Sequence, residues 1–422
     1  MSSIFVQIPS YKDSELLPTL KDCIRKSSKK NKITFGLVWQ KESHESIGKF
    51  SKNPDCRVID VPWNQSKGLG WARSLTQGLY QDEDYTLQLD SHHRFSPNWD
   101  MSLIEMLKST QSVSPKPLLT AYAAGYDPAN DKILTPLPCQ ILPRDFKSSG
   151  TIWFNPTNIF NIENIHFPIR ARLVSGHYYF TLGQHCKEYK YDPDMYFAGD
   201  EICLTVRSYT LGYDLFHPDK CFVWHHYGRE DRSKHWNDHG DKQKQEGIVD
   251  KTWGERDEYS KKRIRQLLGE EDNSIDLGVY GLGTERTIKE YETYSGIDFK
   301  NKRIHNCAIN GIEPPVSFAS HEDYEAEFVK KIPIRIAQWP RSEYLKMGKS
   351  LEALVIEFIN LRRVVIHRDV FNYIDVMNMM DNIYQATVIA DNIPMRVVFT
   401  AIVNGQTSHV WERDLKEGIH WS

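Results

Sequence analysis

Short apolar runs alternate with amphipathic runs at the start of the chain, and this alternation constrains the fold more than any other feature. The apolar runs predict strands at residues 4–8, 33–40, 57–61 and 85–89. Helices are predicted after Asp13 and after Gly68, where apolar residues recur at helical spacing. A strand, a helix and a strand within about 40 residues form a right-handed βαβ unit. The chain therefore begins as an α/β domain with a mostly parallel sheet.

The strand predicted at residues 85–89 ends in polar side chains. Asp90, Ser91, His92 and His93 follow it directly. Asp90 and His92 would share a face in a regular strand, and a turn would also let both approach one ion. Ligand crevices in open α/β sheets lie at the carboxyl ends of strands. The segment predicts a divalent-metal site able to carry nucleotide phosphates. The alternative is a strand end with its polar residues in solvent.

Residues of the same kinds recur at two later positions. Asp200 and Glu201 lie where a helix is predicted to begin, so they either cap that helix electrostatically or face a sugar or acceptor hydroxyl. His225 and His226 end another apolar strand. Carboxylates and imidazoles together suit a Mn²⁺-type ion. Such an ion would neutralise a leaving diphosphate without a strong protein acid.

The glycine-containing segment GLGWAR, at residues 68–73, is not a phosphate-binding fingerprint. It lacks the GxGxxG spacing and the Lys-Ser/Thr pair of a P-loop. Its two glycines are instead expected to allow a close approach at the start of a helix. Arg73, in the first turns of that helix, either reaches an anionic ligand or forms a surface ion pair.

Bulk composition excludes several classes of protein. The length of 422 residues suggests two or three domains. A formal net charge of -3 gives no overall basic field for nucleic acid. The seven cysteines are dispersed and form no CxxC pair, which argues against a disulfide framework and a zinc ribbon. No signal peptide and no apolar run of about 18 residues is found. We therefore expect a protein of the reduced cytoplasm without a membrane span.

The composition changes after Lys331. Strand-like runs are found at 332–336, 353–358, 364–366, 385–389 and 396–403. Asn404 and Gly405 then predict a tight turn. The expected organisation is an α/β domain over 1–310, a linker over 311–330 and a small β-rich, all-β domain over 331–422. The last domain has no catalytic constellation, so it is expected to bind a ligand, join protomers into a homo-oligomer or stabilise the enzyme.

Several segments, in order, resemble the GlcNAc-transferase family typified by the cytoplasmic enzyme that modifies hydroxyproline on a ubiquitin-ligase adaptor. They are FVQIPSYKD (5–13), GLGWAR (68–73), LQLDSHHRF (87–95), NWD (98–100), FAGDEI (197–202), WHHYGR (224–229) and YGLGTERTIKEY (280–291). They cover roughly residues 1–300, and the chain after about Lys331 lies outside the resemblance. The family has a GT-A (Rossmann-like) glycosyltransferase fold and resembles the mucin-type polypeptide GalNAc-transferases.

The resemblance implies a UDP-sugar donor, namely UDP-GlcNAc, with Mn²⁺ or Mg²⁺ and retention of anomeric configuration. Asp90 and His92 match the metal-binding D-x-H motif of the family. The later histidine ligand falls on His225 or His226, and the resemblance does not choose between them. The donor-binding residues that it implies are Pro9, Ser10, Tyr11, Asp13, Arg73, Asp90 and Arg229.

Asp200 and Glu201 match the family's acidic pair near the donor sugar and the acceptor. Without an obvious protein nucleophile, the leaving phosphate would take the acceptor proton. The pair would then position the sugar and stabilise developing positive charge.

The acceptor hydroxyl is expected on a protein, of the Ser, Thr or hydroxyproline type. The alternatives are a glycan or hydroxylated DNA as acceptor, or a catalytically inactive sugar-binding scaffold. An inactive scaffold should have lost part of the site, yet Asp90, His92, Asp200 and Glu201 are all present.

Overall fold

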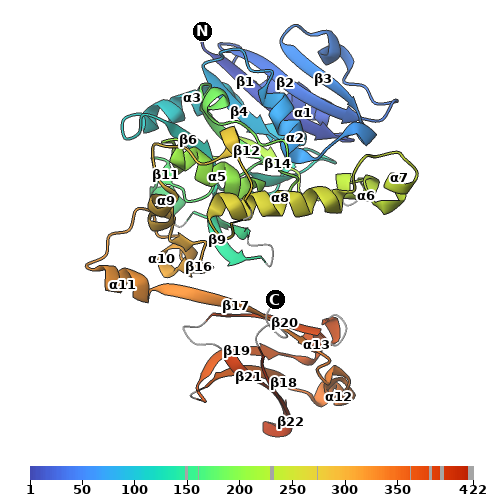
Figure 1. The fold of residues 1–422 in the computed structure, drawn as a ribbon, viewed down its shortest axis with the longest axis vertical. Helices are drawn as coiled ribbons and strands as arrows, with labels where there is room; N and C mark the ends of the chain where they lie inside the picture. The colour runs from blue at the N-terminus through green and yellow to red at the C-terminus, as the bar shows by residue number, and fades with distance from the viewer. Residues whose placement is uncertain are drawn as a thin grey trace. The chain divides into compact units, whose positions relative to one another are not determined.

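The computed structural model describes residues 1–147, 151–159, 161–228, 232–272, 274–361, 363–379, 383–389 and 394–416. The chain folds as two compact units (Figure 1). Unit 1 comprises Met1–Lys300 and Cys307–Ser317, and unit 2 comprises Asn301–Asn306 and Phe318–Ser422. The segment expected to be a linker, 311–330, contains helix α11 (His321–Ala326) and the first residues of strand β17 (Phe328–Ala337).

An eight-stranded sheet with the order β11-β13-β6-β12-β4-β1-β2-β3 forms the centre of unit 1. Its strands are β1 (Ser3–Tyr11), β2 (Lys32–Lys41), β3 (Cys56–Pro62), β4 (Tyr85–Leu89), β6 (Pro117–Thr120), β11 (Ile169–Arg170), β12 (Tyr178–Leu182) and β13 (Asp214–His217). The parallel arrangement expected for the first four strands is confirmed. The sheet as a whole is mixed, because β12 runs antiparallel to both β4 and β6.

Amphipathic helices cover this sheet and bury its apolar side chains. They include α1 (Leu16–Lys26), α2 (Leu69–Gln77), α3 (Trp99–Thr110) and α5 (Asp200–Thr210), while α8 (Trp253–Leu268) shares a buried apolar cluster with α5. Leu16 and Leu20 of α1 pack with Ile4 and Val6 of β1 in the main core. Around the start of α2, a side chain at Gly70 would place its Cβ 2.3 Å from the carbonyl oxygen of Met195. The expected close approach at this helix start is therefore confirmed.

A second, four-stranded sheet brings distant polar residues to the end of β4. It consists of β5 (His93–Phe95), β14 (Val223–His225), β7 (Ala124–Asp127) and β8 (Lys132–Ile133). β14 pairs antiparallel with β5, so His225 lies opposite His93. Because β5 begins three residues after Asp90, this pairing delivers the end of β14 to the polar segment that follows β4.

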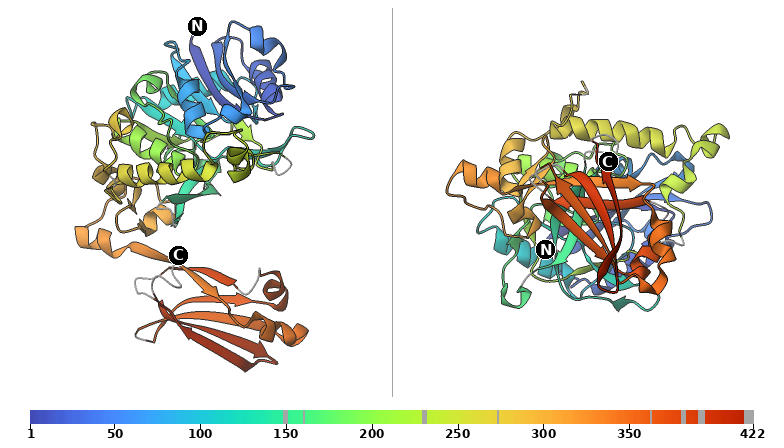
Figure 2. Two further views of the ribbon diagram at one scale, coloured as in Figure 1. Left: turned by 45° about the vertical axis from the view of Figure 1, so that its right-hand side comes forward. Right: turned by 90° about the horizontal axis from the view of Figure 1, so that it is seen from below.

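Unit 2 is β-rich, as expected, and Figure 2 shows its strands in orange to red. β17 pairs with β20 (Ile383–Ile389), and a second antiparallel sheet contains β19 (Val365–Phe371), β18 (Ala353–Asn360), β21 (Pro394–Val403) and β22 (Gln406–Asp414). The expected turn before β22 is confirmed, with φ of 52° at Asn404 and 69° at Gly405. The unit is not all-β, because it also contains short helices α11, α12 (Arg341–Lys346) and α13 (Tyr373–Asn378).

Candidate functional site

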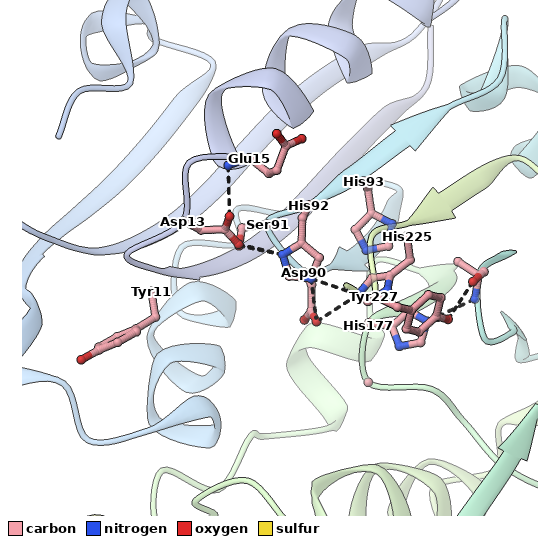
Figure 3. A network of polar contacts seen from close by, with 12 residues as sticks. Tyr11, Asp13, Glu15, Asp90, Ser91, His92, His93, His177, His225 and Tyr227 are labelled. Carbon is pink, nitrogen blue, oxygen red and sulfur yellow. Dashed lines mark hydrogen bonds and ion pairs between the residues drawn. The ribbon is translucent and has the colours of Figure 1, made fainter. Parts of the chain in front are cut away.

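Three residues from two segments of unit 1 converge beyond the end of β4. Asp90 follows β4, His92 precedes β5, and His225 ends β14. The Nε2 atoms of His92 and His225 lie 3.0 Å apart, and they lie 3.7 and 3.6 Å from Oδ2 of Asp90. Figure 3 shows both rings directed at Asp90, and one ligand atom from each residue lies within 4.8 Å of the others.

The side-chain atoms of this group are suited to bind a divalent ion. The carboxylate of Asp13 lies 2.7 Å from Nδ1 of His92, so we assign the ring proton to Nδ1. The lone pair of His92 Nε2 then faces His225 and Asp90. Burial, followed by the charge of His177, lowers the pKa of His225 well below its usual value, so its ring is neutral. Two imidazoles and a carboxylate suit Mn²⁺ or a related ion.

Asp90 is ionised and accessible. Burial alone would raise the pKa of Asp90, but interaction with His225, His92 and Arg73 lowers it well below its usual range. Its side chain is 25% exposed, whereas both histidines are buried. A ligand can therefore approach the group from the side of Asp90.

Arg73 joins Asp90 to the acidic pair at the start of α5. Its guanidinium is buried, pairs with Asp200, and donates a hydrogen bond of 2.6 Å to the carbonyl oxygen of Gly176. The same side chain lies 3.5 Å from Oδ1 of Asp90. A Cβ at Gly176 would lie 2.7 Å from Nη1 of Arg73, so a glycine is needed beside the guanidinium.

The acidic pair occupies the first two positions of α5, as predicted. Asp200 is buried against Arg73, and Glu201 accepts hydrogen bonds from the hydroxyl of Tyr122 at 2.7 Å and the amide of Gly176 at 2.9 Å. Burial raises the pKa of both carboxyl groups, and this effect is partly opposed by Arg73 at Asp200 and by the hydrogen bonds from Gly176 and Tyr122 at Glu201. The pair is thus fixed by protein contacts and not merely exposed at a helix end.

Two cavities meet at Asp90. The first has a volume of about 330 Å³, and its lining includes Pro9, Tyr11, Gln40, Ser91, His92, Tyr196, Arg232, Lys234, His235 and Trp236. The second has a volume of about 260 Å³, and its lining includes Arg73, Tyr122, Lys147, Phe154, His177, Asp200 and Glu201. Leu69, Asp90, Phe197 and Tyr227 line both. Asp90 therefore lies between the first cavity and the space in front of the acidic pair.

The remaining residues that were expected at the site do not all line the two cavities. Pro9 and Tyr11 line the first cavity, whereas Ser10 and Asp13 are buried and line neither of the two. The ring of His226 lies 5.9 Å from that of Tyr126 and is not part of the ligand group. Arg229 lies outside the described residues.

Sequence reasoning missed several residues around the site. The ring of His177 packs 4.4 Å from that of His225, and Tyr227 packs 4.3 Å from it on a second side. Arg232 and His235 line the first cavity, and neither belongs to a motif recognised in the sequence. The sequence did contain one signal for this segment: His235 and His239 are four residues apart, a spacing that brings side chains together on a helix. In the structure their rings stack with centroids 3.8 Å apart.

The family of the chain follows from a comparison with protein-family models. A model described as glycosyltransferase (GlcNAc) matches residues 3–55 and 49–301, which is more than half of the chain. The chain belongs to this GlcNAc glycosyltransferase family. The match includes Asp90, His92, Arg73, the acidic pair and His225. No relative was found among curated protein sequences.

Structures of GalNAc-T7 and of S. aureus TarS are among the solved structures that match the chain. A structure of GalNAc-T7 with UDP, GalNAc and Mn²⁺ is 14% identical in sequence and has a TM-score of 0.45. The match covers 69% of this chain and 54% of the GalNAc-T7 chain. Structures of S. aureus TarS 1–349 with UDP and with UDP-GlcNAc are each 11% identical, with TM-scores of 0.36. The two matches cover 66% and 64% of this chain, and 74% and 73% of the respective TarS chains. The chain spans about half the length of the GalNAc-T7 chain.

Two further observations concern the cysteines and the apolar character of the helices. All seven cysteines are free thiols. Within the described ranges, no helix combines the length and the apolar character needed to cross a membrane.

Proposed function

We propose that the chain is a metal-dependent, retaining glycosyltransferase that moves GlcNAc from UDP-GlcNAc to a hydroxyl group, with a protein as acceptor. One observation carries the proposal: Asp90, His92 and His225 converge, and Asp90 lines both cavities. Family membership supplies the class of reaction. The site geometry supports the proposal, because a diphosphate facing Asp90 would lie between the two cavities that Asp90 lines.

The first cavity suits the nucleoside part of the donor. Tyr11, His235 and Trp236 offer ring faces and edges to a base, while Arg232 and Lys234 add positive charge. The diphosphate would then reach Asp90. An ion held by Asp90, His92 and His225 would neutralise the charge that develops on the leaving diphosphate.

The second cavity suits the sugar and the acceptor hydroxyl. Asp200 is paired with Arg73, and both oxygens of Glu201 accept hydrogen bonds from protein groups. Neither carboxylate is therefore placed as a free nucleophile. We assign them to orienting the sugar and to stabilising positive charge on its ring as the bond to the diphosphate lengthens. A phosphate oxygen of the departing diphosphate takes the acceptor proton, which keeps the new bond on the same face of the sugar.

The donor can be tested by measuring UDP release from a panel of nucleotide sugars. UDP-GlcNAc should be hydrolysed faster than UDP-GalNAc or UDP-glucose when no acceptor is added. Preference for either of the other sugars would overturn the assignment of the donor.

The acceptor can be tested with labelled donor and a cell lysate. Label should appear in protein and survive nuclease treatment. Label confined to nucleic acid or to protein-free glycan would overturn the protein acceptor while leaving the transfer chemistry in place.

A further inference from the structure

Asp13 is buried and lines neither of the two cavities. Its side chain is only 2% exposed. Its Oδ2 atom lies 2.7 Å from Nδ1 of His92 and accepts a hydrogen bond of 2.6 Å from the hydroxyl of Ser91. Its Oδ1 atom accepts the backbone amide of Glu15 at 3.0 Å. These contacts orient the carboxylate toward His92, as Figure 3 shows.

Arg232 gives Asp13 a second connection, to the first cavity. Its Nη1 atom lies 2.7 Å from Oδ2 of Asp13 and donates to the carbonyl oxygen of Tyr11 at 2.8 Å. Arg232 and Tyr11 both line the first cavity. Asp238, six residues later, accepts from the hydroxyl of Tyr11 at 2.9 Å and from Nζ of Lys12 at 3.1 Å. Arg232 and Asp238 therefore both hold their segment against residues 11–13, at the end of β1.

We propose that Asp13 is a positioning residue for His92, and that Arg232 couples occupancy of the first cavity to this contact. The inference rests on the proposed function, because His92 must serve as a metal ligand. A carboxylate that accepts the Nδ1 proton fixes the tautomer and orientation of the imidazole and makes Nε2 a better metal ligand. Arg232 contacts the same carboxylate oxygen, Oδ2, and so helps to hold it in place.

The coupling works in both directions. A nucleoside in the first cavity that contacts both Tyr11 and Arg232 would hold Arg232 on Asp13 more firmly. His92 would then be fixed before an ion arrives, so less ordering would remain to oppose metal binding. By linkage, a bound ion must strengthen nucleoside binding by the same factor.

The contribution of Asp13 can be measured by Mn²⁺ titration of the full chain, with the electron paramagnetic resonance signal of free Mn²⁺ as readout. Asp13→Asn should weaken Mn²⁺ binding by about 10- to 100-fold, the usual effect of losing such a partner. Asp192→Asn is a matched control, because Asp192 forms another buried carboxylate–guanidinium pair, with Arg263, away from the ligands. It should leave the affinity unchanged. Unchanged affinity in Asp13→Asn, with a circular dichroism spectrum like that of wild type, would overturn the role of Asp13.

Uridine tests the coupling, because it lacks phosphates and cannot contact the ion through them. Saturating uridine should raise the Mn²⁺ affinity of wild type about five-fold or more, within the usual range for coupled sites. Arg232→Met should still bind Mn²⁺ but lose this response. The same response in Arg232→Met as in wild type would overturn the role of Arg232.

The proposed function fails separately from this inference. Mn²⁺ binding that Asp90→Ala leaves unchanged would remove the metal site itself, and the inference with it. Mn²⁺ binding that Asp90→Ala abolishes, but that neither Asp13→Asn nor uridine alters, would overturn only the inference.

Discussion

Removing Arg73 should strongly destabilise unit 1, because the change leaves a carboxylate buried without its counter-charge. Arg73 and Asp200 have side-chain exposures of 3% and 4%. Removal of one partner of a buried ion pair costs about 3–5 kcal/mol. Replacement of both partners by neutral side chains is often close to neutral. Arg73→Met and Asp200→Asn should therefore each lower the free energy of unfolding by roughly this amount, and the double variant should recover much of the loss.

Urea denaturation followed by far-ultraviolet circular dichroism would measure this double-mutant cycle, with the transition of unit 1 followed separately from that of unit 2. The exposed pair of Lys116 and Glu188, 27% and 32% exposed, is a suitable control. Lys116→Met should change stability by no more than about 1 kcal/mol. Losses that simply add in the Arg73→Met/Asp200→Asn variant would refute the argument, since independent sites show no recovery.

Further variants test other parts of the structure. Burial raises the pKa of Glu201, so the folded protein binds more protons than the unfolded chain between the two pKa values, and stability falls as pH rises through that interval. The melting-temperature gain of Glu201→Gln over wild type should therefore be larger at pH 7.5 than at pH 4, and the reverse order would contradict this sign. Gly176→Ala should displace Arg73, lower stability by about 1–3 kcal/mol and reduce UDP release; full activity would show that the contact can relax. Gly405→Ala should lower the melting temperature of unit 2, because Gly405 has φ of 69°, while UDP release stays unchanged.

The sequence was most informative where local pattern decides structure. β1, β2 and β4 are almost entirely buried apolar runs, and their parallel order follows from short crossovers. Asp90 and His92 could be proposed as ligands because they directly follow one of these strands. Asp200 and Glu201 could be placed at a helix start because acidic residues favour that position.

Contacts between distant segments could not be predicted in the same way. β5 and β14 have three residues each, too few to show a period. Only their pairing selects His225 over His226, because adjacent residues of a strand point to opposite faces. The burial of Asp13 depends on Arg232, more than 200 residues later, and no local pattern links the two.

The role of Arg73 shows the same limit. Its place in the first turns of α2 allowed either an anionic ligand or a surface ion pair. The structure instead buries it between Asp90, Asp200 and Gly176, where it also lines the second cavity. Its partners come from three separate segments, so helix position alone could not reveal this third arrangement.

Metal dependence of donor hydrolysis tests the central claim most directly. Protein stripped with a chelator should release no UDP from UDP-GlcNAc, and Mn²⁺ should restore the release in wild type and in Asp192→Asn. Asp90→Ala should stay inactive at every Mn²⁺ concentration, because Asp90 lies within 3.7 Å of both histidine nitrogens and is the accessible member of the group. Full activity of wild type without metal, or of Asp90→Ala with it, would contradict the account.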